Sequence, residues 1–287
     1  GLGDVYKRQL HDKNREANIL ALHETLKNRT FKNSEYSTFT IYEPKERIIF
    51  RLPYYPDRIL HHAIMNILEP IWVSVFTKDT YSCIKGRGIH GAMRNVKRAI
   101  KDRENARYCL KIDIRKFYPS IDHDVLKAII RRKIKCKDTL ALLDTIIDST
   151  DGVPIGNYLS QYFANLMLAY FDHWIKEEKR VRYYFRYADD MVFLASTKEE
   201  LHILLADIKK YLAALKLTLK GNEQIFPIAE NRADKHGRGL DFVGFVFYHN
   251  QTLMRKSIKQ NFCRMAARLN KKLNISARDY KQRLCSW

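Results

Sequence analysis

Two spacings of hydrophobic residues alternate along the first part of the chain and distinguish helices from strands. Apolar residues recur every three or four positions over Ile19–Leu26. They do so again from Asp57, where one face carries Ile59, Leu60, Ala63, Ile64 and Ile67. This spacing predicts helices. Phe39–Leu52 instead alternates residue by residue, with a break at Pro44, and predicts two strands.

The second half of the chain predicts a sheet packed against helices. Tyr108–Ile114 has the pattern of a strand, and its two-residue period puts Cys109, Lys111 and Asp113 on one side. A helix is expected from Asp122, whose carboxylate can cap it, and the clearest helix is expected over Leu159–Ile175. Val181–Ala195 predicts two strands joined by a polar tip.

The elements that follow complete the prediction of the fold class. Thr197–Glu200 is a capping box that opens another helix, and short strands are expected around Leu217–Leu219 and Phe242–Tyr248. Lys256–Leu284 is basic and has a helical pattern. This order of elements predicts an α+β fold in which helices back one face of a sheet.

The net charge of the chain limits the kinds of molecule that it is expected to bind. Among 287 residues, 52 are Lys or Arg and 32 are Asp or Glu, which gives a net charge of +20. Such a charge attracts nucleic acid or an anionic membrane. No run of 18 apolar residues exists to span a bilayer, so we expect nucleic acid and no membrane. The basic residues are spread along the chain, which fits a groove that follows a phosphate backbone.

The cysteines and the chain ends add two expectations. The five cysteines form no C-x-x-C pair, which indicates free thiols in a reducing compartment and therefore a cytoplasmic protein. Residues 1–9 look like a non-native leader. The helical pattern continues to Trp287, so we expect that the sequence is truncated at its C-terminus.

Three aspartates form the strongest candidate site. Asp189 and Asp190 are adjacent at the predicted hairpin tip, where like charges raise a carboxylate pKa or require a cation. A sheet could bring Asp113, at the end of an earlier strand, beside them. Three such carboxylates can hold two Mg²⁺ ions, roughly 3.5–4 Å apart, for in-line phosphoryl transfer. An isolated Asp-Asp pair is usually a solvated turn. The surrounding sequence therefore has to show whether this pair belongs to a metal site.

The surrounding segments resemble the motifs of reverse transcriptases. Tyr187–Asp190 between hydrophobic strands is similar to the signature hairpin of that family, and Lys111–Ile121 resembles its first catalytic strand. Three further segments are similar to the fingers motif, the motif after it and the primer grip, in that order: Arg47–Arg58, Tyr81–Gly88 and Phe242–Phe245. The motifs follow the family order from about residue 40 to 260.

The resemblance implies a right-hand polymerase with three parts. Residues 10–106 would form the fingers with an N-terminal helix, residues 107–248 the palm with helices at 122–178, and residues 249–287 a short helical thumb. It also implies an RNA-directed DNA polymerase that binds template RNA, a cDNA primer and deoxynucleotides. Its two Mg²⁺ ions, replaceable by Mn²⁺, would bind Asp113, Asp189, Asp190 and the backbone of Ile114.

The same resemblance assigns roles around the incoming nucleotide. Arg47, Arg51 and the backbone amides of Lys116 and Phe117 would face its triphosphate. Tyr118 would exclude a ribose 2′-hydroxyl. Lys220 would protonate the leaving pyrophosphate, although relatives carry this lysine a few residues later, where Glu223 stands. The remaining candidates are Ile155, Gly156 and Gln161 for nucleotide binding, and Phe242, Val243, Gly244 and Phe245 for the primer grip.

One segment points to a subfamily. Pro154–Gln161 stands where most reverse transcriptases have Q-G-x-x-x-S-P. Ile155 before the glycine and Gln161 after the serine resemble the enzymes of bacterial and phage diversity-generating retroelements. These are related to retron and group II intron enzymes. That resemblance implies error-prone copying of a template-repeat RNA, for mutagenic retrohoming, with a small basic accessory variability protein.

Three alternatives remain open from the sequence. A retron or group II intron-like enzyme of ordinary fidelity would share the motifs, and so would an RNA-templated RNA polymerase or a protein-primed phage-defence reverse transcriptase. A nucleic-acid-binding protein that has lost catalysis would show decay at the carboxylates, and Asp113, Asp189 and Asp190 are all intact.

Overall fold

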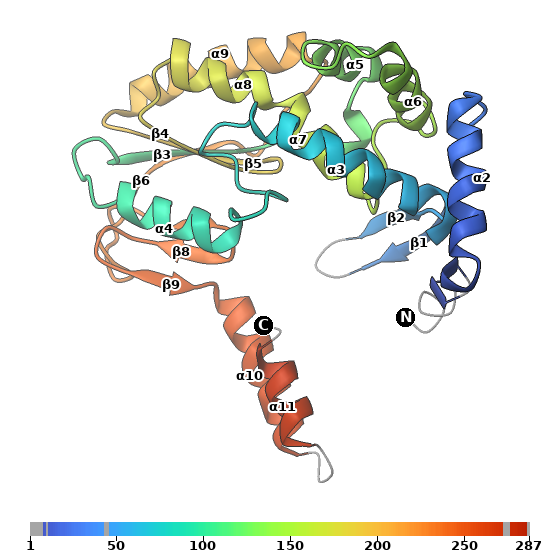
Figure 1. Cartoon of the computed structure of the whole chain (residues 1–287). Coiled ribbons are helices and arrows are strands. Elements are labelled where there is room, and N and C mark those ends of the chain that lie inside the picture. The colour runs from blue at the N-terminus through green and yellow to red at the C-terminus, as the bar shows by residue number, and fades with distance from the viewer. Residues whose placement is uncertain (1–7, 10, 43–45, 272–275, 286–287) are drawn as a thin grey trace.

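The computed structural model of the chain combines three antiparallel sheets with helices (Figure 1). It describes all residues except 1–7, 10, 43–45, 272–275 and 286–287. Most of the proposed leader and the strand break at Pro44 lie outside the described residues. No helix among the described residues is long and apolar enough to cross a membrane.

A four-stranded sheet forms the centre of the molecule. Its order is β4-β5-β3-β6, in which every neighbouring pair is antiparallel. The strands are β3 Tyr108–Asp113, β4 Tyr183–Tyr187, β5 Asp190–Ala195 and β6 Gln224–Pro227. The predicted hairpin over Val181–Ala195 is confirmed as β4 and β5. Leu217–Leu219 is not a strand, since only Leu219 pairs there, with Ile114, and β6 follows instead.

Helices cover one face of this central sheet. They are α5 His123–Arg131, α7 Tyr158–Met167, α8 Ala169–His173 and α9 Lys198–Ala214. The side chains of Asp122 and Thr197 cap α5 and α9, as the sequence predicts. The single helix predicted over Leu159–Ile175 is wrong, because Leu168 (φ −107°, ψ 3°) separates α7 from α8. One residue with altered dihedrals hardly disturbs the apolar spacing, so the sequence pattern does not reveal the break.

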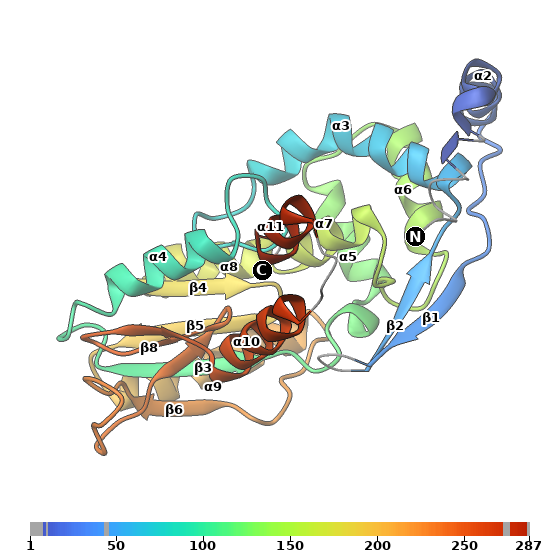
Figure 2. The same ribbon diagram turned by 90° about the horizontal axis from the view of Figure 1, so that it is seen from below.

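The opposite face of the central sheet is also covered, which corrects the prediction of helices on one face only. Helix α4, Ile89–Ala99, packs against β4 and β8. A second sheet, β7-β8-β9, consists of Leu240–Phe242, Phe245–Phe247 and Thr252–Met254. Figure 1 shows α4 and β8 below the central sheet, and Figure 2, seen from below, shows them in front of it. Cys109, Phe185, Val192 and Leu194 pack against them in a second hydrophobic cluster.

The N-terminal part forms an arm to one side of the central sheet, and its last helix packs against α7 (Figure 1). It contains α2 Arg15–Lys27, the hairpin of β1 Ser37–Ile41 and β2 Arg47–Arg51, and α3 Ile59–Val73. On α3, Leu60 and Ile64 are buried while Ile67 is 69% exposed, so the prediction that Ile67 shares their face is wrong. Helix α6, Lys137–Ile147, packs beside α5.

Two helices end the described chain. They are α10 Lys256–Asn270 and α11 Ala277–Cys285, which confirm the helical pattern predicted for this region. In Figure 1 they extend away from the central sheet, below β9.

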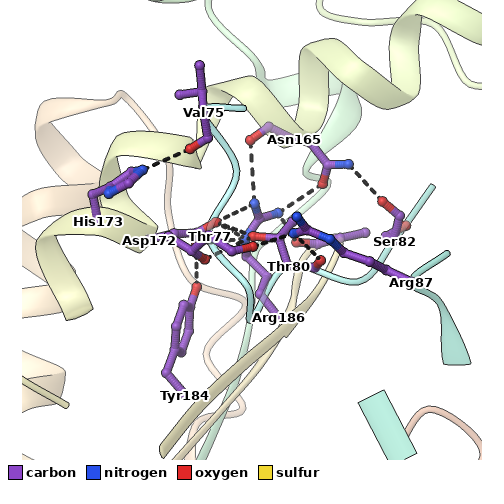
Figure 3. A network of polar contacts seen from close by, with 11 residues as sticks. Val75, Thr77, Thr80, Ser82, Arg87, Asn165, Asp172, His173, Tyr184 and Arg186 are labelled. Carbon is purple, nitrogen blue, oxygen red and sulfur yellow. Dashed lines mark hydrogen bonds and ion pairs between the residues drawn. The ribbon is translucent and has the colours of Figure 1, made fainter. Parts of the chain in front are cut away.

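A buried ion pair ties the central sheet to its helices (Figure 3). Arg186 of β4 donates to the carboxylate of Asp172 in α8, with Nη2–Oδ2 at 2.6 Å, and both side chains are 0% exposed. Tyr184 and Thr80 donate to the same carboxylate at 2.6 and 2.8 Å. Arg186 also donates to Asn165 of α7. The charge is thus paired and hydrogen-bonded, as burial requires.

We expect the loss of one partner of this ion pair to destabilise the fold more than the loss of both partners. Arg186→Met or Asp172→Asn alone leaves an uncompensated buried charge and should lower the free energy of unfolding by about 3–5 kcal/mol. The double variant removes both charges and should recover part of that loss. Urea unfolding of the four proteins measures this, and a double variant less stable than both single variants would contradict it.

Candidate active site

The register of the central sheet brings the predicted carboxylates together. Asp113, the last residue of β3, pairs with Asp190, the first residue of β5. Asp190 also pairs with Tyr187 across the hairpin, so Ala188 and Asp189 form a two-residue tip. Ala188 has φ +55°, an unfavourable conformation for a residue with a Cβ. Nη1 of Arg186 donates to its carbonyl at 3.1 Å and supports the tip.

The carboxylates at the tip resist ionisation. Burial, followed by the nearby charge of Asp113, raises the pKa of Asp189 to about 6. Burial also raises the pKa of Asp190 to about 6, although Lys111 opposes the shift. A raised carboxylate pKa means that ionisation at neutral pH costs folding stability. A bound cation would offset that cost.

Two lysines supply positive charge at the site. Nζ of Lys220 lies 3.0 Å from Oδ2 of Asp113, and Nζ of Lys111 lies 3.3 Å from Oδ2 of Asp190. Sequence reasoning included Lys220 but missed Lys111. Its position two residues before Asp113 on the same strand was the available signal, because that spacing puts both side chains on one face.

The site fits a hard divalent cation chemically. As the side chains stand, no group of three His, Cys, Asp or Glu residues in the described chain is arranged to hold a metal ion. However, Oδ1 of Asp190 is buried without a hydrogen-bond partner among the described residues. Carboxylate oxygens are the ligands that Mg²⁺ prefers, and an unpaired buried oxygen is costly unless it gains such a partner.

Tyr118 lies close to this carboxylate group. The chain turns after β3 through Lys116 (φ +45°), and Phe117 is buried in the core. The charges of Asp189 and Arg47 both act on the Tyr118 hydroxyl, whose pKa is raised mainly by burial. The carbonyl of Tyr118 accepts from the amide of Val153 at 2.9 Å, which ties this turn to the segment that contains Ile155.

A backbone contact joins that segment to the N-terminal arm. The amide of Phe50 in β2 donates to the carbonyl of Ile155 at 2.8 Å. Gly156 (φ +123°) follows, and a Cβ there would lie 2.4 Å from the carbonyl oxygen of Phe50, so the position requires glycine. Arg51, Gly156 and Gln161 line a cavity of about 370 Å³. Arg58, His61, His62 and Tyr158 also line it, and the sequence analysis did not assign these four to nucleotide binding.

The predicted primer-grip segment is a hairpin that packs on the face of the central sheet that carries Lys111 and Asp190. Phe242 ends β7 and Phe245 begins β8, and both residues of the tip have positive φ, Val243 +45° and Gly244 +87°. Lys111 donates to the carbonyl of Asp241, so one ammonium links this hairpin to Asp190. Burial is complete for Phe242, which shows that its side chain serves packing.

Comparisons with known proteins agree with this architecture. The family model described as reverse transcriptase (RNA-dependent DNA polymerase) matches residues 42–222. Protein YkfC of Escherichia coli K12 is 24% identical over 266 residues, covering 76% of this chain and 67% of that protein. The group II intron-encoded protein LtrA of Lactococcus lactis is 27% identical over 139 residues, covering 45% of this chain and 23% of LtrA.

Solved structures show the same fold at low sequence identity. A truncated apo telomerase from Candida tropicalis superposes with a TM-score of 0.60 at 14% identity, covering 78% of this chain and 55% of the telomerase chain. Telomerase from the same organism in complex with a fragment of telomeric RNA gives 0.58 at 13% identity, covering 82% and 49%. The chain thus spans about half of these telomerases.

The matched family region covers well over half of the chain, and it contains the β3 strand, the β4–β5 hairpin and all three carboxylates. The chain therefore belongs to the reverse transcriptase, or RNA-dependent DNA polymerase, family.

Proposed function

We propose that this chain synthesises DNA on an RNA template by metal-dependent nucleotidyl transfer. The observation that carries the proposal is the pairing of Asp113 with Asp190, beside Asp189, in a member of this family. When bound, two Mg²⁺ ions would stabilise the attacking and leaving oxygens of the displacement. Asp113, Asp189, Asp190 and the carbonyl of Ile114 would hold them.

The neighbouring groups have complementary roles in this proposal. Arg47 and Arg51 attract the triphosphate, and the amides of Lys116 and Phe117 face it. Lys220, whose ammonium lies 3.0 Å from Asp113, would donate a proton to the leaving pyrophosphate. Residues 10–106, 107–248 and 249–287 would act as fingers, palm and thumb, with Phe242–Phe245 holding the primer strand.

For the subfamily, we propose an error-prone enzyme of a diversity-generating retroelement. Its support is Ile155 before Gly156, with Gln161 in place of proline. Ile155 has no side-chain donor or acceptor, so it cannot restrain a nucleotide as glutamine can. The template-repeat RNA, the small basic accessory protein and the cytoplasmic location belong to this same proposal.

A second candidate is a group II intron-like enzyme of ordinary fidelity. It is favoured by the similarity to LtrA, whose name identifies it as a group II intron-encoded protein. The two candidates share the carboxylates and differ in error rate. Fidelity therefore discriminates between them.

Asp189→Asn should reduce primer extension by orders of magnitude while RNA binding persists, because the change removes charge but little volume. Mg²⁺ should raise the melting temperature of the wild type and raise that of the variant less. The matched control is Asp124→Asn, at an exposed position of α5. Full extension by Asp189→Asn, or by the wild type in EDTA, would exclude the metal-dependent site.

Tyr118→Ala should admit ribonucleotides, because removing the ring opens space for a 2′-hydroxyl. Use of deoxynucleotides should change little. Tyr118→Phe keeps the ring and should keep the selectivity. The ratio of kcat/KM for the two sugars measures the effect, and an unchanged ratio in Tyr118→Ala would assign Tyr118 to packing.

Ile155→Gln should lower the error rate. One or two restored neutral hydrogen bonds, at roughly 0.5–1.5 kcal/mol each, correspond to about two- to 150-fold in discrimination. Sequencing of cDNA made on a template with all four bases measures this, with Ile155→Leu as the control. The resemblance to diversity-generating enzymes implies that wild-type errors are concentrated opposite adenine. Uniformly few errors in the wild type would favour the group II intron-like candidate.

A further inference from the structure

Helix α4 has one buried apolar face and one exposed cationic face. Ala92, Val96 and Ala99 are buried against the central sheet and β8. Arg94, Lys97 and Arg98 lie three and four positions apart and are exposed, and Lys101 follows just after the helix. The helix contains no Asp or Glu, so its exposed face carries a single sign of charge.

The four cations of this face have no ion-pair partner among the described residues. Asp102, the nearest acid in sequence, already accepts from Asn105 and Tyr183. Helix α9 on the other side of the sheet differs, since Lys209 and Lys210 there lie near Glu223 and Asp207. The charge on α4 therefore remains available to an external anion.

The C-terminal end of α4, with Lys97, Arg98 and the following Lys101, lies away from the reaction centre. Asp102, three residues beyond the helix end, accepts from the hydroxyl of Tyr183 at 2.8 Å. Tyr183 begins β4, whereas the carboxylate tip follows the other end of that strand. Four residues of strand correspond to about 13 Å. The C-terminal end of α4 is thus at the far end of the sheet from the tip (Figure 1).

A phosphate backbone fits this face better than a protein or a membrane. Protein interfaces need an apolar or aromatic core, and the cationic face has none. An interfacial membrane helix inserts its apolar face, and that of α4 is buried in the protein. Unpaired exposed cations in a stripe are the contacts that phosphates require.

We propose that Arg94, Lys97 and Arg98 of α4, together with Lys101 just after it, form a second RNA-binding surface. It holds a part of the RNA that lies outside the polymerase cleft, such as a structured flank of the template. The choice of RNA as the partner rests on the proposed function. The surface adds affinity and orientation without base specificity, because it offers contacts to phosphates alone.

The test compares two RNA probes with two charge-matched variants. One probe is a short RNA template annealed to a DNA primer, and the other is the same duplex carrying a long RNA hairpin beyond the template. The test variant is Arg94→Gln/Lys97→Gln/Lys101→Gln. The control is Lys133→Gln/Lys137→Gln/Lys198→Gln, which removes three exposed cations near α5, α6 and α9.

We expect the α4 variant to lose about tenfold or more in affinity for the hairpin probe, with a salt slope smaller by about 2–3. Its affinity for the short probe and its extension of that primer should match the wild type. The control should retain its affinity for both probes. An unchanged affinity for the hairpin probe, or an equal loss by the control, would overturn the proposal. Failure of the wild type to extend either primer would instead reject the proposed function.

Discussion

The buried pair of Arg186 and Asp172 is the constraint on which the rest of the site depends. Arg186 lies on the face of β4 opposite to the carboxylates, and its guanidinium reaches α7, α8 and the hairpin tip (Figure 3). Its backbone amide donates to Asp79 and its carbonyl accepts from Tyr81. A buried guanidinium must keep its partners, so these elements cannot move independently of the tip.

The opposite face of the same strands has the reverse electrostatic character. Asp113, Asp189 and Asp190 are gathered there against their mutual repulsion, and Lys111 and Lys220 compensate only part of it. The raised pKa values of Asp189 and Asp190 are the physical cost of this arrangement. Strong support on one face of the sheet and a demand for cations on the other make the tip suited to hold metal ions, since it remains ordered while its charge is unbalanced.

Family membership and detailed activity rest on different features. The strands and the hairpin that define the family come from residues within 42–222. The features that separate subfamilies are single side chains, such as Ile155, on a segment held by one backbone hydrogen bond to β2. Such a segment can exchange side chains without altering the fold. Similarity of fold to telomerase therefore does not indicate the fidelity or the template of this chain.

The sequence by itself determined the elements whose signals are local. The hairpin, the caps at Asp122 and Thr197, and the candidate carboxylates follow from neighbouring residues, because periodicity and capping act over a few positions. Tertiary structure decided the break at Leu168, the exposure of Ile67 and the cover on the second face of the sheet. It also decided that Lys111 meets Asp190 and that Arg186 meets Asp172. These outcomes depend on register and on packing between distant segments, which no local pattern encodes.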